Sequence, residues 1–268
     1  MEIEDYPPQE PLSEAAIAYQ REVMARGSTV NGGDEIQTGP DPYQSLVMFR
    51  SGRPNGTTLA FIHGGGWTNG YKEWMTFMAP AFTGAGITFA SIGYRLAPKH
   101  TFPSGFEDAC AGVRWILDNI ANYGGKPDRV FVGGHSAGGH YASLLALTEL
   151  SDQVQGCLPI SGVYDFGAHS GLTTRPRFLG SAEDKNEQAA SPISNIGERP
   201  CPFLLAHGSN DFPHLIEQAR RMKEALAIKG SDVSRITLAD RNHFTASYAG
   251  GEAEGPWVPH AISWMLTH

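Results

Sequence analysis

Short apolar runs alternate with segments of helical periodicity along most of this chain. The runs at residues 59–62, 87–92 and 130–132 are rich in aromatic and β-branched residues, and apolar residues recur at helical spacing between them. Parallel strands need a crossover connection, and a helix between successive strands supplies it. Helices then cover both faces of the sheet. The alternation therefore predicts an α/β fold with a mostly parallel central sheet.

The same alternation gives the approximate position of each element. We expect further strands at residues 157–160, 203–206 and 236–238, and helices at about 73–82, 106–120, 137–148, 213–228 and 256–266. The length of 268 residues suits one domain. Two segments fall outside the pattern, an N-terminal arm (residues 1–45) and a polar, Gly-rich stretch (residues 166–197). We expect both to act as short lid segments over a site.

The charge balance limits the kinds of partner. The chain has 28 acidic and 20 basic residues, a formal net charge of −8, and no run of Lys or Arg, which argues against nucleic acid or an anionic membrane surface. Its acidic, proline-bearing start does not resemble a secretory leader, and no apolar stretch approaches the roughly 20 residues that span a bilayer. We expect a cytoplasmic protein that binds a small molecule. The sequence leaves its oligomeric state open, a homodimer included.

The motif Gly134-His-Ser-Ala-Gly138 lies between a predicted strand and a predicted helix. In that context Gly-x-Ser-x-Gly is typical of a nucleophile elbow, a sharp turn that lifts the serine hydroxyl off the end of the sheet. The turn crowds the positions two before and two after the serine, which explains the glycines. The alternative, that Ser136 only caps the helix, leaves the glycines unexplained. We predict that Ser136 is a catalytic nucleophile.

A second glycine-rich turn, His63-Gly-Gly-Gly66, ends an earlier predicted strand. Backbone N–H groups in such a turn can approach a substrate oxygen without obstruction by side chains. Together with the elbow, the turn predicts an oxyanion hole formed by the N–H groups of Gly65, Gly66 and Ala137, the residue after the nucleophile.

A serine hydroxyl attacks well only when a histidine takes its proton and an acid orients that histidine. Asp211 and His243 both follow predicted strands, in the chain order expected after such an elbow. The carboxyl ends of parallel strands are where ligands bind, so the two side chains should meet Ser136 there. We predict that Asp211 is the acid and His243 the base.

The sequence also allows other assignments of the acid and the base. Asp240 and Asp165 are rival acids, although Asp240 lies too near His243 in sequence to reach it freely from another strand. Asp165 would serve only if the acid followed the strand before. Asp211 could also cap the next helix, which is compatible with catalysis. His243 could be an ordinary surface or core histidine, and we expect His207 to be structural.

The motifs Phe61-Ile-His-Gly-Gly-Gly-Trp67, Gly93-Tyr-Arg-Leu-Ala-Pro98 and Gly134-His-Ser-Ala-Gly-Gly139 resemble those of the α/β-hydrolases. The chain is most similar to the arylformamidase (kynurenine formamidase) branch and, more distantly, to the hormone-sensitive-lipase-like esterases, from about residue 59 to 243. His135 and the sequence Ser209-Asn-Asp-Phe212 favour the formamidase branch. Gly66 is shared with the lipase-like group, whereas formamidases often carry an aromatic residue there.

The resemblance implies an α/β-hydrolase fold and a serine hydrolase that cleaves a small acyl ester or an aryl formamide or amide. The acyl-enzyme mechanism needs no metal and no organic cofactor, and the histidines are not clustered in sequence. Trp67 and Phe244 follow the oxyanion glycines and His243, so we predict that they bind substrate, with core packing as the alternative. The alternative function is a non-catalytic ligand receptor on the same fold.

Overall fold

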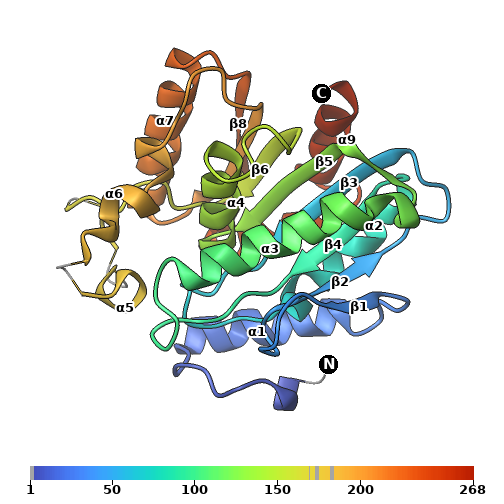
Figure 1. The fold of residues 1–268 in the computed structure, drawn as a ribbon, viewed down its shortest axis with the longest axis horizontal. Helices are drawn as coiled ribbons and strands as arrows, with labels where there is room; N and C mark the ends of the chain where they lie inside the picture. The colour runs from blue at the N-terminus through green and yellow to red at the C-terminus, as the bar shows by residue number, and fades with distance from the viewer. Residues whose placement is uncertain (1–2, 169, 173–174, 182–183) are drawn as a thin grey trace.

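A computed structural model describes residues 3–168, 170–172, 175–181 and 184–268. Its described strands form one sheet of eight, in the order β1-β2-β4-β3-β5-β6-β7-β8. Strands β1, β2 and β4 pair antiparallel, and every pairing from β4 to β8 is parallel. The predicted α/β fold with a mostly parallel sheet is confirmed (Figure 1).

The bounds of the elements follow the predicted alternation closely. The strands are β1 (Asp34–Gln37), β2 (Ser45–Phe49), β3 (Gly56–Ile62), β4 (Thr88–Ile92), β5 (Gly125–His135), β6 (Gly156–Ile160), β7 (Phe203–Asn210) and β8 (Val233–Asn242). The α-helices are α1 (Glu14–Gly27), α2 (Ala79–Gly84), α3 (Ser104–Asn119), α4 (Ala137–Leu147), α5 (Arg175–Leu179), α6 (Asn186–Ala190), α7 (Pro213–Ile228), α8 (His243–Tyr248) and α9 (Val258–Thr267). Short 3₁₀ helices are η1 (Ile3–Asp5), η2 (Lys72–Met78), η3 (Ile120–Tyr123), η5 (Pro192–Ser194) and η6 (Ala249–Gly251).

The N-terminal arm is more regular than the sequence pattern indicates. It contains α1, which begins after the capping residue Ser13 and buries only Tyr19 and Val23. It also contains the edge strand β1, whose residues are partly or fully exposed. Strand β1 is mainly polar and α1 buries only two side chains, so neither shows the apolar periodicity that identified the other elements.

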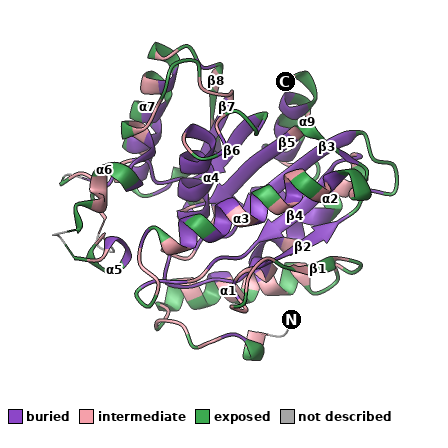
Figure 2. Ribbon diagram, viewed as in Figure 1, coloured by how far each residue is buried: buried purple, intermediate pink, exposed green. Residues whose placement is uncertain are grey.

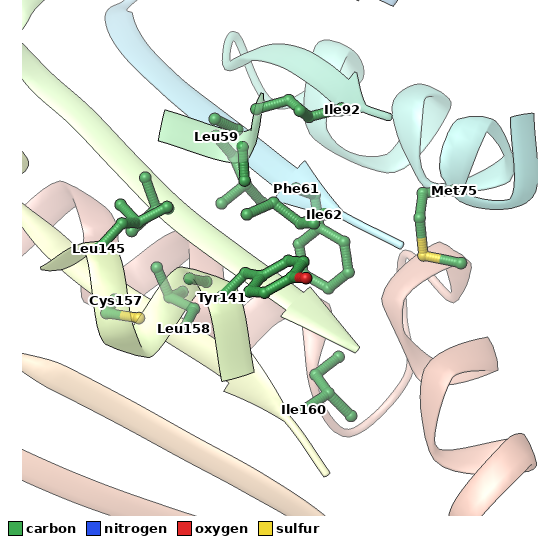
Figure 3. Close-up of a cluster of buried hydrophobic side chains, with 14 of the residues drawn as sticks. Leu59, Phe61, Ile62, Met75, Ile92, Tyr141, Leu145, Cys157, Leu158 and Ile160 are labelled. Carbon is green, nitrogen blue, oxygen red and sulfur yellow. The ribbon is translucent and has the colours of Figure 1, made fainter. Parts of the chain in front are cut away.

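Helices cover both faces of the sheet. Side chains on a strand alternate between faces, and on one face Ile92 of β4 packs against α3. On the other face Phe89 of β4 stacks on Phe82 of α2, with ring centroids 5.8 Å apart. Strands β3 and β4 are buried throughout (Figure 2). Apolar side chains from β3, β4, β6 and α4 fill the core between sheet and helices (Figure 3).

The sheet places four candidate groups at one edge. His63, Ser136, Asp211 and His243 stand at or directly after the carboxyl ends of the strands β3, β5, β7 and β8, which are parallel to one another. No helix in the described part of the chain is long and apolar enough to cross a bilayer.

The two predicted lid segments meet near this edge. Arg177 of the 166–197 segment forms an ion pair with Glu10 of the N-terminal arm. Inside the same segment, Phe166 and Phe178 are buried although the stretch is polar overall. Residues 169, 173–174 and 182–183 of the predicted lid lie outside the described residues.

Candidate active site

The elbow around Ser136 has the tight backbone that its glycines predict. Ser136 has φ 54° and ψ −116°, a conformation that non-glycine residues rarely adopt. A Cβ on Gly138 would lie 2.0 Å from the carbonyl oxygen of Ile62, and one on Gly134 would lie 2.3 Å from the Gly138 backbone. The Ser136 N–H donates to the Ile160 carbonyl at 2.9 Å, which anchors the turn to β6. The glycines are therefore required by close backbone contacts.

Ser136, His243 and Asp211 form a continuous chain of hydrogen bonds. The Ser136 Oγ lies 2.9 Å from His243 Nε2, and His243 Nδ1 lies 2.9 Å from Asp211 Oδ1. Ser161 Oγ donates to the other carboxylate oxygen of Asp211. The structure thus brings together the three side chains predicted as nucleophile, base and acid.

The surroundings of Asp211 keep its carboxylate ionised. Burial by itself raises the pKa of this group, but the hydrogen bond and charge of His243, with the hydrogen bonds from Ser161 and the Phe212 N–H, outweigh it. The pKa of Asp211 is lowered from 3.8 to about 2 as a result. An ionised carboxylate at Nδ1 holds the imidazole in the tautomer that leaves Nε2 free to accept a proton from Ser136.

The rival carboxylates have other partners. Asp165 pairs with Arg221 at 2.8 Å and accepts from the Gly167 N–H. Asp240 is exposed at the end of β8, and its backbone N–H donates to Ser209 Oγ. His207 is buried and donates from Nδ1 to the carbonyl of Gly208 at 2.9 Å. Of the carboxylates weighed from the sequence, only Asp211 bonds His243 in the structure.

The loop from Gly64 to Gly70 carries the predicted oxyanion donors. Gly65 has φ 115°, and a Cβ there would lie 2.0 Å from the Asn69 carbonyl oxygen. Gly65 and Gly66 both line the cavity that contains Ser136. Ala137 opens α4, so its N–H has no partner within that helix. The loop and the start of α4 thus both lie beside Ser136, and the assignment of their N–H groups as oxyanion donors stays a prediction.

The N-terminal arm braces this loop, which no sequence motif had indicated. Gln9 Nε2 donates to the Gly70 carbonyl at 2.9 Å, and Gln9 Oε1 accepts from the Gly70 N–H at 2.8 Å. Asn69 Nδ2 donates to the carbonyl of Glu10. The Asn69 N–H in turn donates to the Gly65 carbonyl at 3.0 Å. A chain of hydrogen bonds therefore connects the arm to the oxyanion loop.

Two further histidines support the site through hydrogen bonds to its backbone and side chains. His135 Nε2 donates to the backbone carbonyl of His243 at 2.9 Å. His140 Nδ1 accepts from Trp67 Nε1 at 3.1 Å, and its Nε2 donates to the Ala190 carbonyl. Burial lowers the pKa of both imidazoles to about 3, so both are neutral. His135 fixes the backbone of His243, and His140 fixes the side chain of Trp67.

A cavity of about 590 Å³ opens over Ser136. Residues of α1, the oxyanion loop, the segment after β6 and the start of α7 line it. Phe244 is half-buried in its wall. Trp67 also lines it, but is 97% buried and stacks on Phe178 with ring centroids 4.3 Å apart, so it belongs to the core as well.

The described lining is largely apolar. Its titratable side chains are His135, His214, His243 and Tyr19, and no described Lys, Arg, Asp or Glu reaches it. Across the described ranges no cluster of three or more His, Cys, Asp or Glu side chains is placed to hold a metal ion.

Comparison with known proteins shows that the chain is similar to esterases. The BD-FAE family profile matches residues 50–226. Esterase LipC of Mycobacterium tuberculosis is 32% identical over 256 residues, covering 85% of this chain and 63% of LipC. A probable isoprenylcysteine alpha-carbonyl methylesterase, ICMEL1 of Oryza sativa subsp. japonica, is 40% identical over 213 residues, covering 69% of this chain and 50% of that protein. The chain thus spans less than two thirds of the length of either relative.

The fold is also that of a solved esterase. The monoclinic form of the Pyrobaculum calidifontis esterase matches with a TM-score of 0.79 over 98% of this chain and 94% of that one. The two sequences are only 20% identical, so this likeness speaks for the fold alone.

Proposed function

The chain belongs to the BD-FAE family of α/β-hydrolases, and on that premise we propose that it is a serine carboxylic ester hydrolase. One observation carries the proposal: the hydrogen-bonded chain from Ser136 Oγ through His243 to Asp211, open to a cavity. Nucleophile, base and acid stand in the order that acyl transfer requires.

The geometry supports a two-step mechanism. Ser136 Oγ attacks the ester carbonyl carbon while His243 Nε2 takes the hydroxyl proton. The N–H groups of Ala137, Gly65 and Gly66 stabilise the resulting oxyanion. His243 then returns the proton to the leaving alcohol, and water, activated by the same imidazole, hydrolyses the acyl-enzyme.

The lining of the cavity supports an uncharged substrate. Burying a charged group without a partner is costly, and the described lining offers no carboxylate, ammonium or guanidinium group. A compact acyl group on a flat apolar alcohol fits it best. Hydrolysis of an aryl formamide, which the sequence also predicted, uses the same groups and stays a prediction, because the relatives described above are esterases.

Labelling and turnover together test the proposal. We expect a serine-directed phosphonate to modify wild-type protein at Ser136, and Ser136→Ala to lose turnover of 4-nitrophenyl acetate by about 10⁴-fold or more. Ser263→Ala, on the exposed face of α9, is the matched control and should keep full activity. Because the change removes one oxygen at a cavity wall, the melting temperature should stay unchanged.

The same experiment tests the alternative function, a non-catalytic ligand receptor on the same fold. A folded wild-type protein that neither reacts with the phosphonate nor hydrolyses any ester or aryl formamide would overturn the proposal and favour a ligand-binding role.

A further inference from the structure

Phe212 is a large apolar side chain that the fold leaves in the open. It is 45% exposed, one of the few such side chains among the described residues. It follows Asp211 directly, stands immediately before α7 and lines the cavity over Ser136. Exposing an aromatic ring forgoes the free energy of its burial. An exposed ring at the mouth of a cavity is therefore a candidate ligand contact.

The position of the ring is fixed by its neighbours. The Phe212 N–H donates to Asp211 Oδ1 at 2.7 Å, and its carbonyl accepts from the Leu215 N–H at 2.9 Å. The ring lies nearly parallel to the imidazole of His214, at 10° with centroids 5.8 Å apart. Burial lowers the pKa of His214, which favours the neutral ring at neutral pH. The backbone of Phe212 is thus fixed, and its flat ring stands beside a second ring at the mouth of the cavity.

The chemistry of acyl transfer identifies which part of the substrate lies here. The leaving alcohol takes its proton from Nε2 of the base, so it departs beside the imidazole of His243. The Phe212 ring lies 4.8 Å from that imidazole, measured between centroids. Phe244 meets the same imidazole edge to face at 5.7 Å. Two aromatic side chains therefore lie beside the imidazole that gives the leaving alcohol its proton.

We propose that Phe212, backed by His214, is a binding surface for the aromatic alcohol part of an uncharged ester. The inference rests on the proposed ester hydrolase function and narrows its substrate class to esters of aryl or arylmethyl alcohols. Offset stacking of rings contributes about 0.5–1.5 kcal/mol beyond area burial, which is about a twofold to tenfold preference in specificity constant.

Three acetate esters separate stacking from bulk and from catalysis: benzyl acetate, cyclohexylmethyl acetate and ethyl acetate. All three give the same acetyl-enzyme, so differences in kcat/KM report acylation and the contacts of the alcohol. We expect Phe212→Ala to lower kcat/KM about tenfold for benzyl acetate, less for cyclohexylmethyl acetate, and less than about twofold for ethyl acetate. Phe212→Leu keeps apolar bulk and should lose only the preference for benzyl over cyclohexylmethyl. Ile228→Ala, at the exposed far end of α7, is the control that should change none of them.

Two outcomes would overturn the inference. If Phe212→Ala lowered kcat/KM equally for all three esters, Phe212 would act by positioning Asp211 and His243. If it left kcat/KM for benzyl acetate unchanged, Phe212 would make no contact with the substrate. Failure of the proposed function is distinguishable, since wild-type protein would then hydrolyse none of the three esters and resist the phosphonate.

Discussion

Replacing Asp211 with asparagine tests the site most sharply, because the change keeps the shape of the side chain and removes its charge. The amide of the Asp211→Asn variant can present an N–H₂ group to His243 Nδ1, which would then have to accept, leaving the proton on Nε2. An imidazole in that tautomer cannot take the proton of Ser136, and the expected loss in kcat is on the order of 10⁴, or about 5 kcal/mol in activation free energy. The pKa of Asp211 is about 2 in the fold and 3.8 for the free side chain. Loss of this carboxylate should therefore lower the free energy of unfolding at neutral pH by only about 2 kcal/mol.

The rival carboxylates supply matched controls. Asp165→Asn breaks a partly exposed ion pair with Arg221, which contributes about 0–1 kcal/mol. Asp240→Asn changes an exposed side chain. Both should keep kcat/KM for 4-nitrophenyl acetate within about threefold of wild type, and circular dichroism melting should show Asp211→Asn still folded at the assay temperature. If Asp165→Asn were the most damaging variant, the acid would follow β6 and our assignment would be wrong.

Two other predictions follow from the buried histidines and from the cavity. Burial lowers the pKa of His63 to about 4 and of His135 and His140 to about 3, so the unfolded chain binds more protons than the folded one below about pH 6.5. The free energy of unfolding, measured with urea, should therefore fall toward pH 4, by up to about 4 kcal/mol per pH unit. A fall of less than about 1.4 kcal/mol per pH unit, the slope for a single proton, would contradict this. The segments that cover the cavity are short stretches of the N-terminal arm and of residues 166–197, so we expect a shallow site without a deep acyl tunnel. The kcat/KM for 4-nitrophenyl esters should therefore fall from acetyl to octanoyl, and a rise would indicate an acyl tunnel.

The meeting of Ser136, His243 and Asp211 could be predicted because each residue is specified locally. Gly134 and Gly138 flank the serine at fixed spacing, since the turn itself forbids a Cβ at both positions. Asp211 and His243 could be placed without knowing any contact between them, because parallel strands bring their carboxyl ends to one edge. The register of β7 with β8, which pairs Asn210 with Asn242, then sets both residues side by side.

The supporting contacts could not be predicted, because they join residues that are distant in sequence. Gln9 bonds Gly70 across 61 positions, and neither residue belongs to a recognisable motif. The bond from His135 to the His243 carbonyl spans 108 positions. Nothing local distinguishes Gln9 from any other polar residue of an N-terminal arm, so its role emerges only when α1 docks beside the loop.

The cavity wall and the groups around Ser136 come from different kinds of segment. The reacting groups stand on strand ends that the buried sheet holds rigid, whereas α1 and the segment after β6 supply much of the cavity wall. Those covering segments meet each other through partly exposed contacts such as the ion pair of Arg177 with Glu10, which contributes little to stability. Substitution in the covering segments therefore changes the shape of the cavity at small cost to the fold, while substitution at the strand ends removes the chemistry. Much of the cavity wall thus comes from other parts of the chain than Ser136, Asp211 and His243, with Phe212 and Phe244 as the exceptions. Hydrogen bonds from the N-terminal arm to the loop from Gly64 to Gly70 connect the two parts.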